Sequence, residues 1–557
     1  MVSTKRADRW ESWGAWAVVG LAFVLRVYGL GFQSLWRDET DALFFATRPL
    51  SRLLSAFAIP GRNGPLYFLL LRGWTLCTGE TEFALRYLSV VAGVLALPLT
   101  WAVARKLGCG RAGLWALPPL AFSPFLVWYA QDAKMYATVL LAVLLATWLF
   151  LKAVETRRPI SWVGYALVVG ALLYLHLLAF LVVPVHLTWL AMDGQAARQR
   201  RSLLVGLGVL GLLALPVALW GVSLFLSDYE SGHVYCPPGR MVQALLTIWV
   251  GGVAGPPGRW ALVGPLFLFL AGVFLAPSGS DAAPGTSVRR LGRHESAVSG
   301  SGQRPLPSPQ PPSLPGAGRE GGARPWRAGV RRGQDRDMAS SLPQVVGRTL
   351  RGWARTRGPA LRLLVWLAGP VVLLSLISLK VPLFTERYLI WVAPAWYLLL
   401  GVGLERVAHV AWGTVAVVCV GVLLVLSALP LWVQSHVPMK SDFRAAAAYV
   451  AEVGQKGDLV LFQIPHGRRT FQYYYRKPYA WAEAPYTNHG QSAEEVGQQM
   501  EELTQGYERV WLVLSEAEMW DRRGLTRRWL DEHGQVVGAR AFARVEVIGC
   551  DLGDAGE

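Results

Sequence analysis

The sequence predicts an all-α polytopic membrane protein with about 11 transmembrane helices, and a small soluble α/β domain at its C-terminal end. Apolar runs of about 18 or more residues, each able to span a hydrocarbon core about 30 Å thick, recur along the 557-residue chain. Hydrophobic residues make up 53% of the chain. Hydropathy falls after Val433, where the patterns of a soluble domain begin.

The eleven predicted spans are apolar segments bounded by polar or basic residues. They are 13–32, 84–104, 112–130, 136–151, 160–175, 177–192, 202–222, 258–276, 363–379, 388–404 and 409–433. No small-residue cleavage site follows the first run, so it is predicted to be a retained helix and not a signal peptide. The apolar segment 64–79 is short for a span and contains Arg72, which predicts a re-entrant or interfacial helix. The alternative is a full crossing, which would invert the inside and outside assignment of everything after it.

The charges predict the topology. The formal net charge is +17 at pH 7, and excess Lys and Arg in membrane proteins gathers in cytoplasmic loops, so nucleic acid is not the indicated partner. Short basic loops at 104–111, 152–158 and 198–201 are therefore placed inside. The loop after the first span, the turn 129–136 and the C-terminal domain are then outside, as expected for a multi-pass protein of the cell (plasma) membrane.

Composition divides the chain into four parts. Residues 1–277 are predicted to be an N-terminal transmembrane module, and 361–433 the C-terminal transmembrane helices. Residues 278–360 are rich in Pro, Gly, Ser and Arg, which predicts a disordered basic cytoplasmic loop because too little apolar surface is present to fold. Residues 434–557 are predicted to be the soluble extracytoplasmic α/β domain.

Elements of the soluble domain follow from local patterns. Ser441 or Asp442 is expected to cap an Ala-rich helix, followed by a Gly turn and a buried strand ending near residue 462. A second strand is expected over 507–516, and a helix closed by Gly534. The run "FQYYYRKPYAW" (471–481) is read as a strand, with an aromatic platform for a sugar as the alternative.

The segment "SLWRDET" places Asp38 and Glu39 just after the first span. The amphipathic segments 41–47 and 50–59 follow, and can lie in the membrane interface with their apolar side down. Charged groups at a bilayer are costly and tend to face cavities or substrates. The alternative is a solvated loop whose carboxylates favour the N-terminal end of a helix dipole.

Two further polar clusters interrupt apolar sequence. Gln131, Asp132 and Lys134 lie between two spans, although the aspartate could simply cap the second helix. Glu386 and Arg387 precede a late span, where a basic residue often only snorkels. A carboxylate can deprotonate a hydroxyl, and cations can stabilise a phosphate leaving group. The set therefore suits a substrate with a lipid tail and a phosphate.

Five motifs in order resemble the C-type integral-membrane glycosyltransferases, nearest to the group that includes dolichyl-phosphate-mannose protein mannosyltransferases and the lipid A aminoarabinose transferase. They are "SLWRDET", "NGPLYFLLLRGW", "GETEFALRYL", "SPFLVWYAQDAKMY" and "PLFTERYLIWVAP". The resemblance covers residues 13–155 closely and 380–405 more loosely.

This resemblance implies a glycosyltransferase of the cell envelope that moves a hexosyl or pentosyl group from a polyprenyl-phosphate donor on the extracytoplasmic face. The acceptor would be a lipid, a glycan or a protein, and membrane lipids would be further partners. Asp38 would be the general base of an inverting attack, Glu39 would support it or position the acceptor, and Asp132 matches the second acidic position.

The resemblance also implies the cations. Arg86 and Arg387 match basic positions of the pattern, Lys134 stands where an arginine is common, and Arg37 and Gln131 complete the expected donor-phosphate and substrate contacts. Some relatives use a divalent metal. The first loop here has adjacent Asp and Glu in place of a DxD pair, so no metal site and no certain cofactor is predicted.

Two other classes are weighed against this interpretation. A transporter or flippase of lipid-linked glycans favours internal repeats and polar groups at the bilayer midplane, whereas the polar groups here lie at its edge. A glycan polymerase or ligase calls for larger outer loops than the one at 223–242. Replacement of Asp38 by Asn distinguishes transfer chemistry from transport, because it should remove a transfer base and leave the protein folded and inserted.

Overall fold

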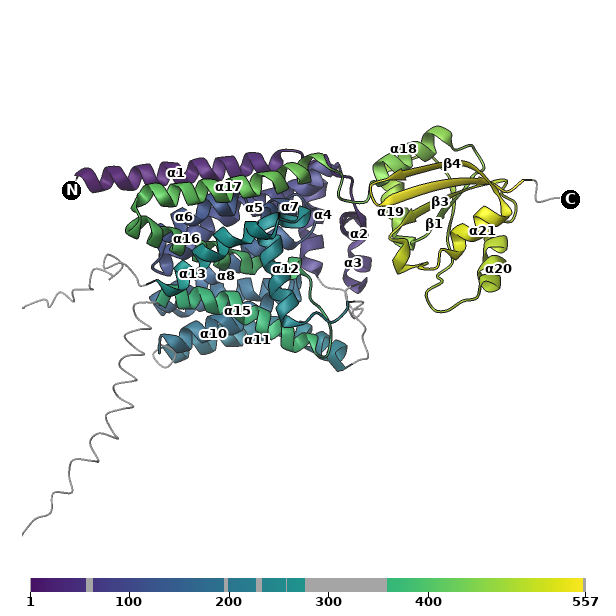
Figure 1. Cartoon of the computed structure of the whole chain (residues 1–557). Helices are drawn as coiled ribbons and strands as arrows, with labels where there is room; N and C mark the ends of the chain where they lie inside the picture. Colours follow the sequence, from purple (N-terminus) through teal and green to yellow (C-terminus); the bar gives the residue numbers. More distant parts are fainter. Residues whose placement is uncertain are drawn as a thin grey trace, which may run out of the picture. The chain divides into compact units, whose positions relative to one another are not determined.

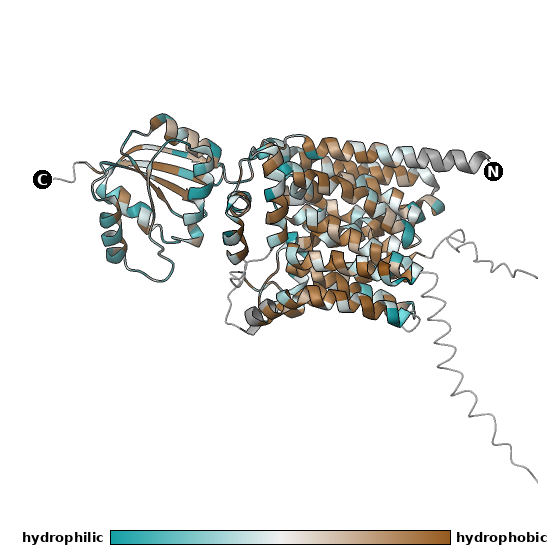
Figure 2. Ribbon diagram, turned by 180° about the vertical axis from the view of Figure 1, so that it is seen from behind, coloured by the Kyte–Doolittle hydropathy of each residue, from teal (hydrophilic) through white to brown (hydrophobic). Residues whose placement is uncertain are grey.

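A computed structural model gives the structure of this chain and describes residues 2–56, 64–194, 199–226, 233–256, 258–275 and 358–553. The described residues form a bundle of helices and a C-terminal domain with a β-sheet (Figure 1). Apolar residues gather in the helical bundle (Figure 2). The insert predicted at 278–360 lies outside the described residues, except for 358–360, which begin helix α15.

The bundle is built from helices of very different length. They are α1 (Val2–Val27), α2 (Arg37–Thr47), α3 (Leu50–Ala56), α4 (Pro65–Thr78), α5 (Glu82–Lys106), α6 (Gly110–Ala121), α7 (Pro124–Ala130), α8 (Tyr136–Thr156), α9 (Pro159–Leu175), η1 (Leu177–Leu181), α10 (Val182–Met192), α11 (Arg200–Leu226), α12 (Pro238–Gly251), η3 (Gly252–Ala254), η4 (Arg259–Leu262), α13 (Val263–Phe274), α15 (Gly358–Ser378), η6 (Glu386–Val392), α16 (Ala393–Val410) and α17 (Trp412–His436).

Within the described residues, six helices are long and apolar enough to cross a membrane. They are Glu82–Lys106, Tyr136–Thr156, Arg200–Leu219, Gly358–Ser378, Glu386–Val410 and Gly413–His436. Each coincides with a predicted span. Three further predicted spans coincide with the shorter apolar helices Trp13–Val27, Pro159–Leu175 and Leu177–Met192. The helical membrane fold is thus confirmed.

Two predicted spans are interrupted. The segment 112–130 divides into α6 and α7 because Ser123 caps a new helix, its side chain accepting a hydrogen bond from Leu126 N, and Pro124 takes the first helical position. The segment 258–276 belongs to a bent pair, in which Pro238–Ala254 and Arg259–Phe274 meet at 118°. The helix α12, at the start of this pair, has no counterpart among the predicted spans.

The short helices after α1 agree with the amphipathic segments. The helix α2 covers the predicted stretch 41–47, α3 covers 50–56 of the second stretch, whose residues 57–59 lie outside the described residues, and α4 covers the helix predicted over 64–79. With only 14 residues, α4 is not among the candidate spans of the described chain. The helix α4 packs against α2 and α5, which places α2 beside the membrane bundle.

Close packing fixes α16 between α6 and α13. A Cβ atom at Gly401 would lie 2.1 Å from the carbonyl oxygen of Ala112, and one at Gly403 would lie 2.0 Å from that of Leu268. Only glycine allows such approach of helix backbones. Since α16 follows η6, this packing also anchors the segment that carries Arg387.

The C-terminal domain has a five-stranded sheet with the strand order β2-β1-β3-β5-β4. Its elements are α18 (Phe443–Val453), β1 (Leu459–Phe462), α19 (Pro465–Tyr474), β2 (Ala480–Glu483), α20 (Ala493–Thr504), β3 (Arg509–Ser515), η7 (Ala517–Met519), α21 (Leu525–His533), β4 (Gln535–Phe542) and β5 (Val545–Asp551). The strand β1 pairs parallel with β2 and β3, whereas β5 pairs antiparallel with β3 and β4.

Alternating side chains of the sheet make two apolar layers. One face packs against α18 and α19, and the other against α20 and α21. The cap at Asp442 and the helix end at Gly534 are observed as predicted. The strand expected over 471–481 is wrong for most of its length: residues up to Tyr474 belong to α19, which packs Phe471 on the sheet, and only Ala480 and Trp481 enter β2.

Candidate active site

Gln33 joins the loop between α1 and α2 to the end of α17 and to the residues that follow it. Its side-chain nitrogen donates hydrogen bonds to the carbonyl oxygens of Gln434 (2.9 Å) and Val437 (2.8 Å), where α17 ends. Its side-chain oxygen accepts hydrogen bonds from the backbone N–H groups of Met439 (2.9 Å) and Lys440 (3.2 Å). The end of the first helix and the start of the C-terminal domain therefore form one unit.

Asp38 and Glu39 stand in the first turn of α2 and have opposite environments. Consecutive helical residues project about 100° apart, so one side chain can face the protein interior while its neighbour does not. Glu39 is 0% exposed and accepts a 3.4 Å hydrogen bond from the backbone of Trp36. The Asp38 side chain is 17% exposed.

The Glu39 carboxylate is ionised and surrounded by donors. Its two oxygens each accept a 2.7 Å hydrogen bond from Arg86. The Nζ atom of Lys440 lies 3.0 Å away, and the backbone N–H of Ala133 donates at 2.9 Å. Burial by itself raises the pKa of Glu39, but these two cations and the hydrogen bonds outweigh it and hold the pKa well below its ordinary value.

Arg86 uses its N–H groups on the protein itself. Besides the two bonds to Glu39, it donates to the carbonyl oxygens of Leu30 and Gln33 at 2.8 Å and of Ser34 at 3.1 Å. A guanidinium has five N–H groups, and the side chain is fully buried. This geometry favours a structural role over the phosphate contact that the sequence predicted.

Asp132 is the second buried carboxylate, in the turn between α7 and α8. One oxygen accepts from Trp36 Nε1 at 3.0 Å and from Lys440 Nζ at 3.2 Å, and the other has no hydrogen-bond partner among the described residues. Burial raises the pKa of this carboxyl, and the nearby Lys440 only partly opposes that effect. Asp132 is close to the predicted base but does not reach the surface.

Cations surround Asp38 instead. The Nη1 atom of Arg387 lies 3.3 Å from its carboxylate, and Arg37 Nε lies 3.9 Å from it. Lys134 Nζ donates to the backbone carbonyl of Asp38 at 3.2 Å. Four predicted site residues, from α2, the 131–135 turn and η6, therefore meet at one place.

Arg387 has the environment of an anion-binding group. Its guanidinium carbon lies 5.7 Å from the ring centres of Trp36 and Tyr136 and 5.9 Å from that of Tyr388. Its Nε has no hydrogen-bond partner among the described residues, and the side chain is 21% exposed. The unpartnered Nε is itself buried, whereas the guanidinium as a whole is partly exposed, and a fork held by aromatic rings can bind a phosphate oxygen at its exposed edge.

The remaining predicted residues divide between the site and its frame. Lys134 lies over the ring of Phe68, at 5.7 Å, near Asp38. Arg37 forms a 3.0 Å ion pair with Glu516 of the C-terminal domain. Gln131 donates to backbone carbonyls where α1 ends, one of them at 2.8 Å. Gln131 therefore joins two segments and does not face Asp38.

Sequence reasoning missed the residues that the C-terminal domain brings to this region. Lys440 joins the buried carboxylates, Arg444 pairs with Glu82, and the Tyr474 hydroxyl accepts from Leu35 N at 2.7 Å. In the sequence, "VPMKSDFR" looks like an ordinary basic boundary after a span. One signal could have pointed to Lys440. Glu39 and Asp132 lie beside apolar segments, and two buried carboxylates need a further cation.

The buried cluster does not fit a divalent metal. The ammonium of Lys440 lies between Glu39 and Asp132, in the place that a bridging cation would take. Within the described residues, no group of three or more His, Cys, Asp or Glu side chains is arranged to hold a metal ion.

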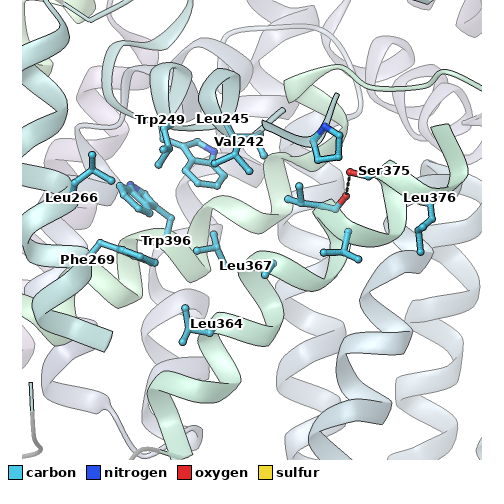
Figure 3. A pocket seen from close by; sticks show the side chains of 15 residues that line it. Val242, Leu245, Trp249, Leu266, Phe269, Leu364, Leu367, Ser375, Leu376 and Trp396 are labelled. Atoms are coloured by element: carbon cyan, nitrogen blue, oxygen red, sulfur yellow. Dashed lines mark hydrogen bonds between the residues drawn. The ribbon is translucent and has the colours of Figure 1, made fainter. Parts of the chain in front are cut away.

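An apolar cavity of about 520 Å³ opens between α12, α13, α15 and α16 (Figure 3). Its wall includes two tryptophans, Trp249 and Trp396, and leucines from three helices. The hydroxyl of Ser375 donates to the backbone carbonyl of Val371 at 2.7 Å, so it adds little polarity. The helix α12, which lines the cavity, also packs against η6, the segment that bears Arg387.

The chain is similar to one protein family in sequence and to solved membrane-protein structures in fold. Residues 62–220 match the family described as dolichyl-phosphate-mannose-protein mannosyltransferase. The structure of ArnT from Cupriavidus metallidurans in the apo state is similar with a TM-score of 0.56 and 14% identity, covering 98% of each chain. ArnT from the same organism bound to undecaprenyl phosphate gives a TM-score of 0.55 and 14% identity, covering 96% of this chain and 97% of that one.

A search of curated protein sequences finds no match. The structural similarities show a shared fold over nearly the whole described chain. Together with the match over 62–220, they confirm the resemblance to C-type integral-membrane glycosyltransferases that the motifs predicted.

Proposed function

We propose that this chain, which has the fold and motifs of the C-type integral-membrane glycosyltransferases, transfers a sugar from a polyprenyl-phosphate donor to an acceptor hydroxyl or amine, with inversion. The observation that carries the proposal is the pair of neighbouring carboxylates. Glu39 is sealed in an ion cluster, whereas Asp38 is partly exposed and lies 3.3 Å from an arginine with a spare donor.

Asp38 is the general base in this mechanism. It takes the proton from the acceptor as the acceptor atom bonds to the anomeric carbon. The bond between that carbon and the phosphate oxygen breaks on the opposite side of the sugar, and its electron pair leaves with the polyprenyl phosphate. One bond forms, one breaks, and the proton stays on Asp38 until it is released to solvent.

Arg387 stabilises the leaving phosphate. In the structure one of its nitrogens contacts Asp38, and its Nε is unpartnered among the described residues. A phosphate at the exposed edge of this guanidinium would gain a charge-assisted hydrogen bond as negative charge develops on the leaving oxygen. Lys134 and Arg37, which also lie beside Asp38, add positive potential there.

The donor's lipid gives the apolar cavity its use. The cavity lies along candidate spans and presents almost only aliphatic and aromatic side chains, and its wall helix α12 packs against η6. An isoprenoid chain, which is apolar throughout, gains about 25 cal/mol for each Å² of its surface that such a wall covers. Undecaprenyl phosphate, the ligand of the ArnT structure, is a lipid of this chemical class.

The side of transfer follows from the positive charges. Because the short basic loops are expected in the cytoplasm, the proposal places Asp38, Arg387 and the C-terminal domain on the extracytoplasmic side of the cell membrane. The acceptor class and the sugar are left to experiment. A cysteine introduced for labelling at exposed Lys456 would report the side on which the domain lies.

The decisive experiment uses purified full-length protein in detergent and a panel of tritiated sugars linked to dolichyl phosphate or undecaprenyl phosphate. Release or transfer of the sugar is compared between wild type and Asp38→Asn. One donor turned over by wild type, with a loss of roughly 100-fold or more in the variant, supports the proposal. Equal turnover in the two proteins would assign the base elsewhere.

A matched variant tests the cavity. Leu367→Trp fills part of the space between α12 and α15. We expect the KM for an undecaprenyl-linked donor to rise roughly tenfold, while that for a short-chain citronellyl-linked donor stays near the wild-type value. Leu376→Trp, at another wall position, repeats the test, and equal KM changes for long and short donors would contradict the assignment.

A further inference from the structure

Lys440 is the first charged residue after the last membrane helix, yet it is almost completely buried. Its side chain is 4% exposed and lies 3.0 Å from Glu39 and 3.2 Å from Asp132. Burial of an ammonium group is costly unless it is paired. The pairing with two carboxylates from the membrane bundle therefore requires an explanation beyond an ordinary basic boundary residue.

Lys440 supplies the second cation of this cluster. Two carboxyl groups, those of Glu39 and Asp132, face the two cations Arg86 and Lys440, and all four side chains are nearly or fully buried. Without the lysine, two buried carboxyl groups would have only the guanidinium of Arg86 as a cation, in a site closed to water. The membrane bundle by itself thus contains an incomplete cluster, and the C-terminal domain supplies the missing cation.

The cluster is connected to the reacting region through the start of α2. Lys440 holds Asp132, Asp132 accepts from Trp36 Nε1, and the Trp36 ring lies beside Arg387. Lys440 also holds Glu39, which is the residue after Asp38 in the same helical turn. Movement of the lysine would therefore move both the predicted base and the predicted phosphate ligand.

We propose that Lys440 is a positioning residue of the transfer site, so that the C-terminal domain completes this site and is not a separable appendage. This inference rests on the proposed function for what is positioned. Lys440 is no substrate ligand here, because its ammonium is enclosed and already paired with two carboxylates. It acts through Glu39 and Asp132 on the segment that carries Asp38.

Contacts from α19 support this role. Thr470 forms a 2.8 Å hydrogen bond with Thr40, and Arg469 a 2.6 Å ion pair with Asp41. Tyr474 binds the backbone N–H of Leu35 at 2.7 Å. The C-terminal domain therefore contacts the chain on both sides of Asp38 in the sequence, at Leu35 before it and at Thr40 and Asp41 after it.

The test uses full-length protein and two substitutions. Lys440→Met removes the cation, whereas Lys440→Met with Asp132→Asn removes one charge of each sign and restores balance around Glu39 and Arg86. Lys456→Met, at an exposed lysine of the same domain, is the control. The readouts are backbone hydrogen exchange over 34–41 and 131–135, which needs no substrate, and turnover of undecaprenyl-phosphate mannose.

We expect Lys440→Met to speed exchange in both segments at least tenfold and to lower kcat by roughly 100-fold. The double variant should return exchange to the wild-type range and recover most of kcat, and the control should match wild type. Recovery separates positioning from substrate contact, because a lost substrate ligand would not return when Asp132 is neutralised.

Two results would overturn the inference. One is wild-type exchange and turnover in Lys440→Met, and the other is a double variant no better than the single one in both readouts. If wild type fails to turn over the mannose donor, the proposed function loses that substrate. The exchange measurement still decides whether Lys440 positions α2, so the two failures are distinguishable.

Discussion

The Asp38–Arg387 pair and the cluster around Glu39 differ in their surroundings, although Asp38 and Glu39 are adjacent residues of one helical turn. The comparison shows how a single turn gives two carboxylates different tasks. Asp38 and Arg387 are partly exposed, and the arginine keeps a spare donor. Glu39 is enclosed by Arg86, Lys440 and a backbone N–H. Adjacent acidic residues therefore need not be equivalent. The buried one, Glu39, has a structural role, because its ion pairs and hydrogen bonds hold neighbouring segments together.

The largest effect is expected at Arg86. Arg86→Met leaves the Glu39 carboxylate with one cation and three backbone carbonyls without their donor. Removing one partner of a buried pair costs about 3–5 kcal/mol. Thermal unfolding in detergent should show a large fall in Tm, with Arg52→Met, at an exposed arginine of α3, as the unaffected control. A normal Tm with weaker donor binding would instead favour the phosphate contact.

Glu39→Gln and Asp38→Asn should separate the two tasks. The neutral glutamine leaves Arg86 and Lys440 with an uncharged partner, so we expect Tm to fall and activity to be lost with it. Asp38→Asn should lower kcat by about 10² to 10⁴ with little change in Tm. The comparison breaks if the two variants lose stability to the same extent.

Arg387→Lys sharpens the exposed side of the comparison. A lysine keeps the charge but loses the planar fork and its contact with aromatic rings. We expect kcat/KM to fall roughly 10- to 100-fold with Tm unchanged. Arg240→Lys, at an exposed position near the start of α12, should be neutral, and an equal loss there would point to general electrostatics.

The smallest effect is expected at Tyr474. Tyr474→Phe removes an acceptor from the Leu35 N–H and a donor from Glu82, which should lower stability by about 1–2 kcal/mol. Tyr473→Phe is a matched control, because the Tyr473 hydroxyl donates only at an exposed carbonyl, that of Glu80. Equal Tm changes in the two variants would mean that the contact of α19 with the loop adds nothing.

Much of the fold is local information. Long apolar runs predict α5, α8 and α17, because the length of a membrane helix is set by the bilayer. Capping residues and strand patterns likewise predict α18, β1 and β3. The helix α12 was missed because its 14 residues are too few for a span, and the strand expected at 471–481 failed because packing on the sheet selects a helix for α19.

The sequence by itself determined the class of the protein and the place of its candidate base, because a carboxylate pair after an apolar run is a local pattern. Tertiary structure decided that Asp38 is the exposed carboxylate and that Arg86 and Lys440 pair with the buried one, Glu39. Glu39, Arg86, Asp132 and Lys440 come from four distant segments. No local periodicity specifies such a cluster: its four side chains become neighbours only when the folded chain brings them together, away from water.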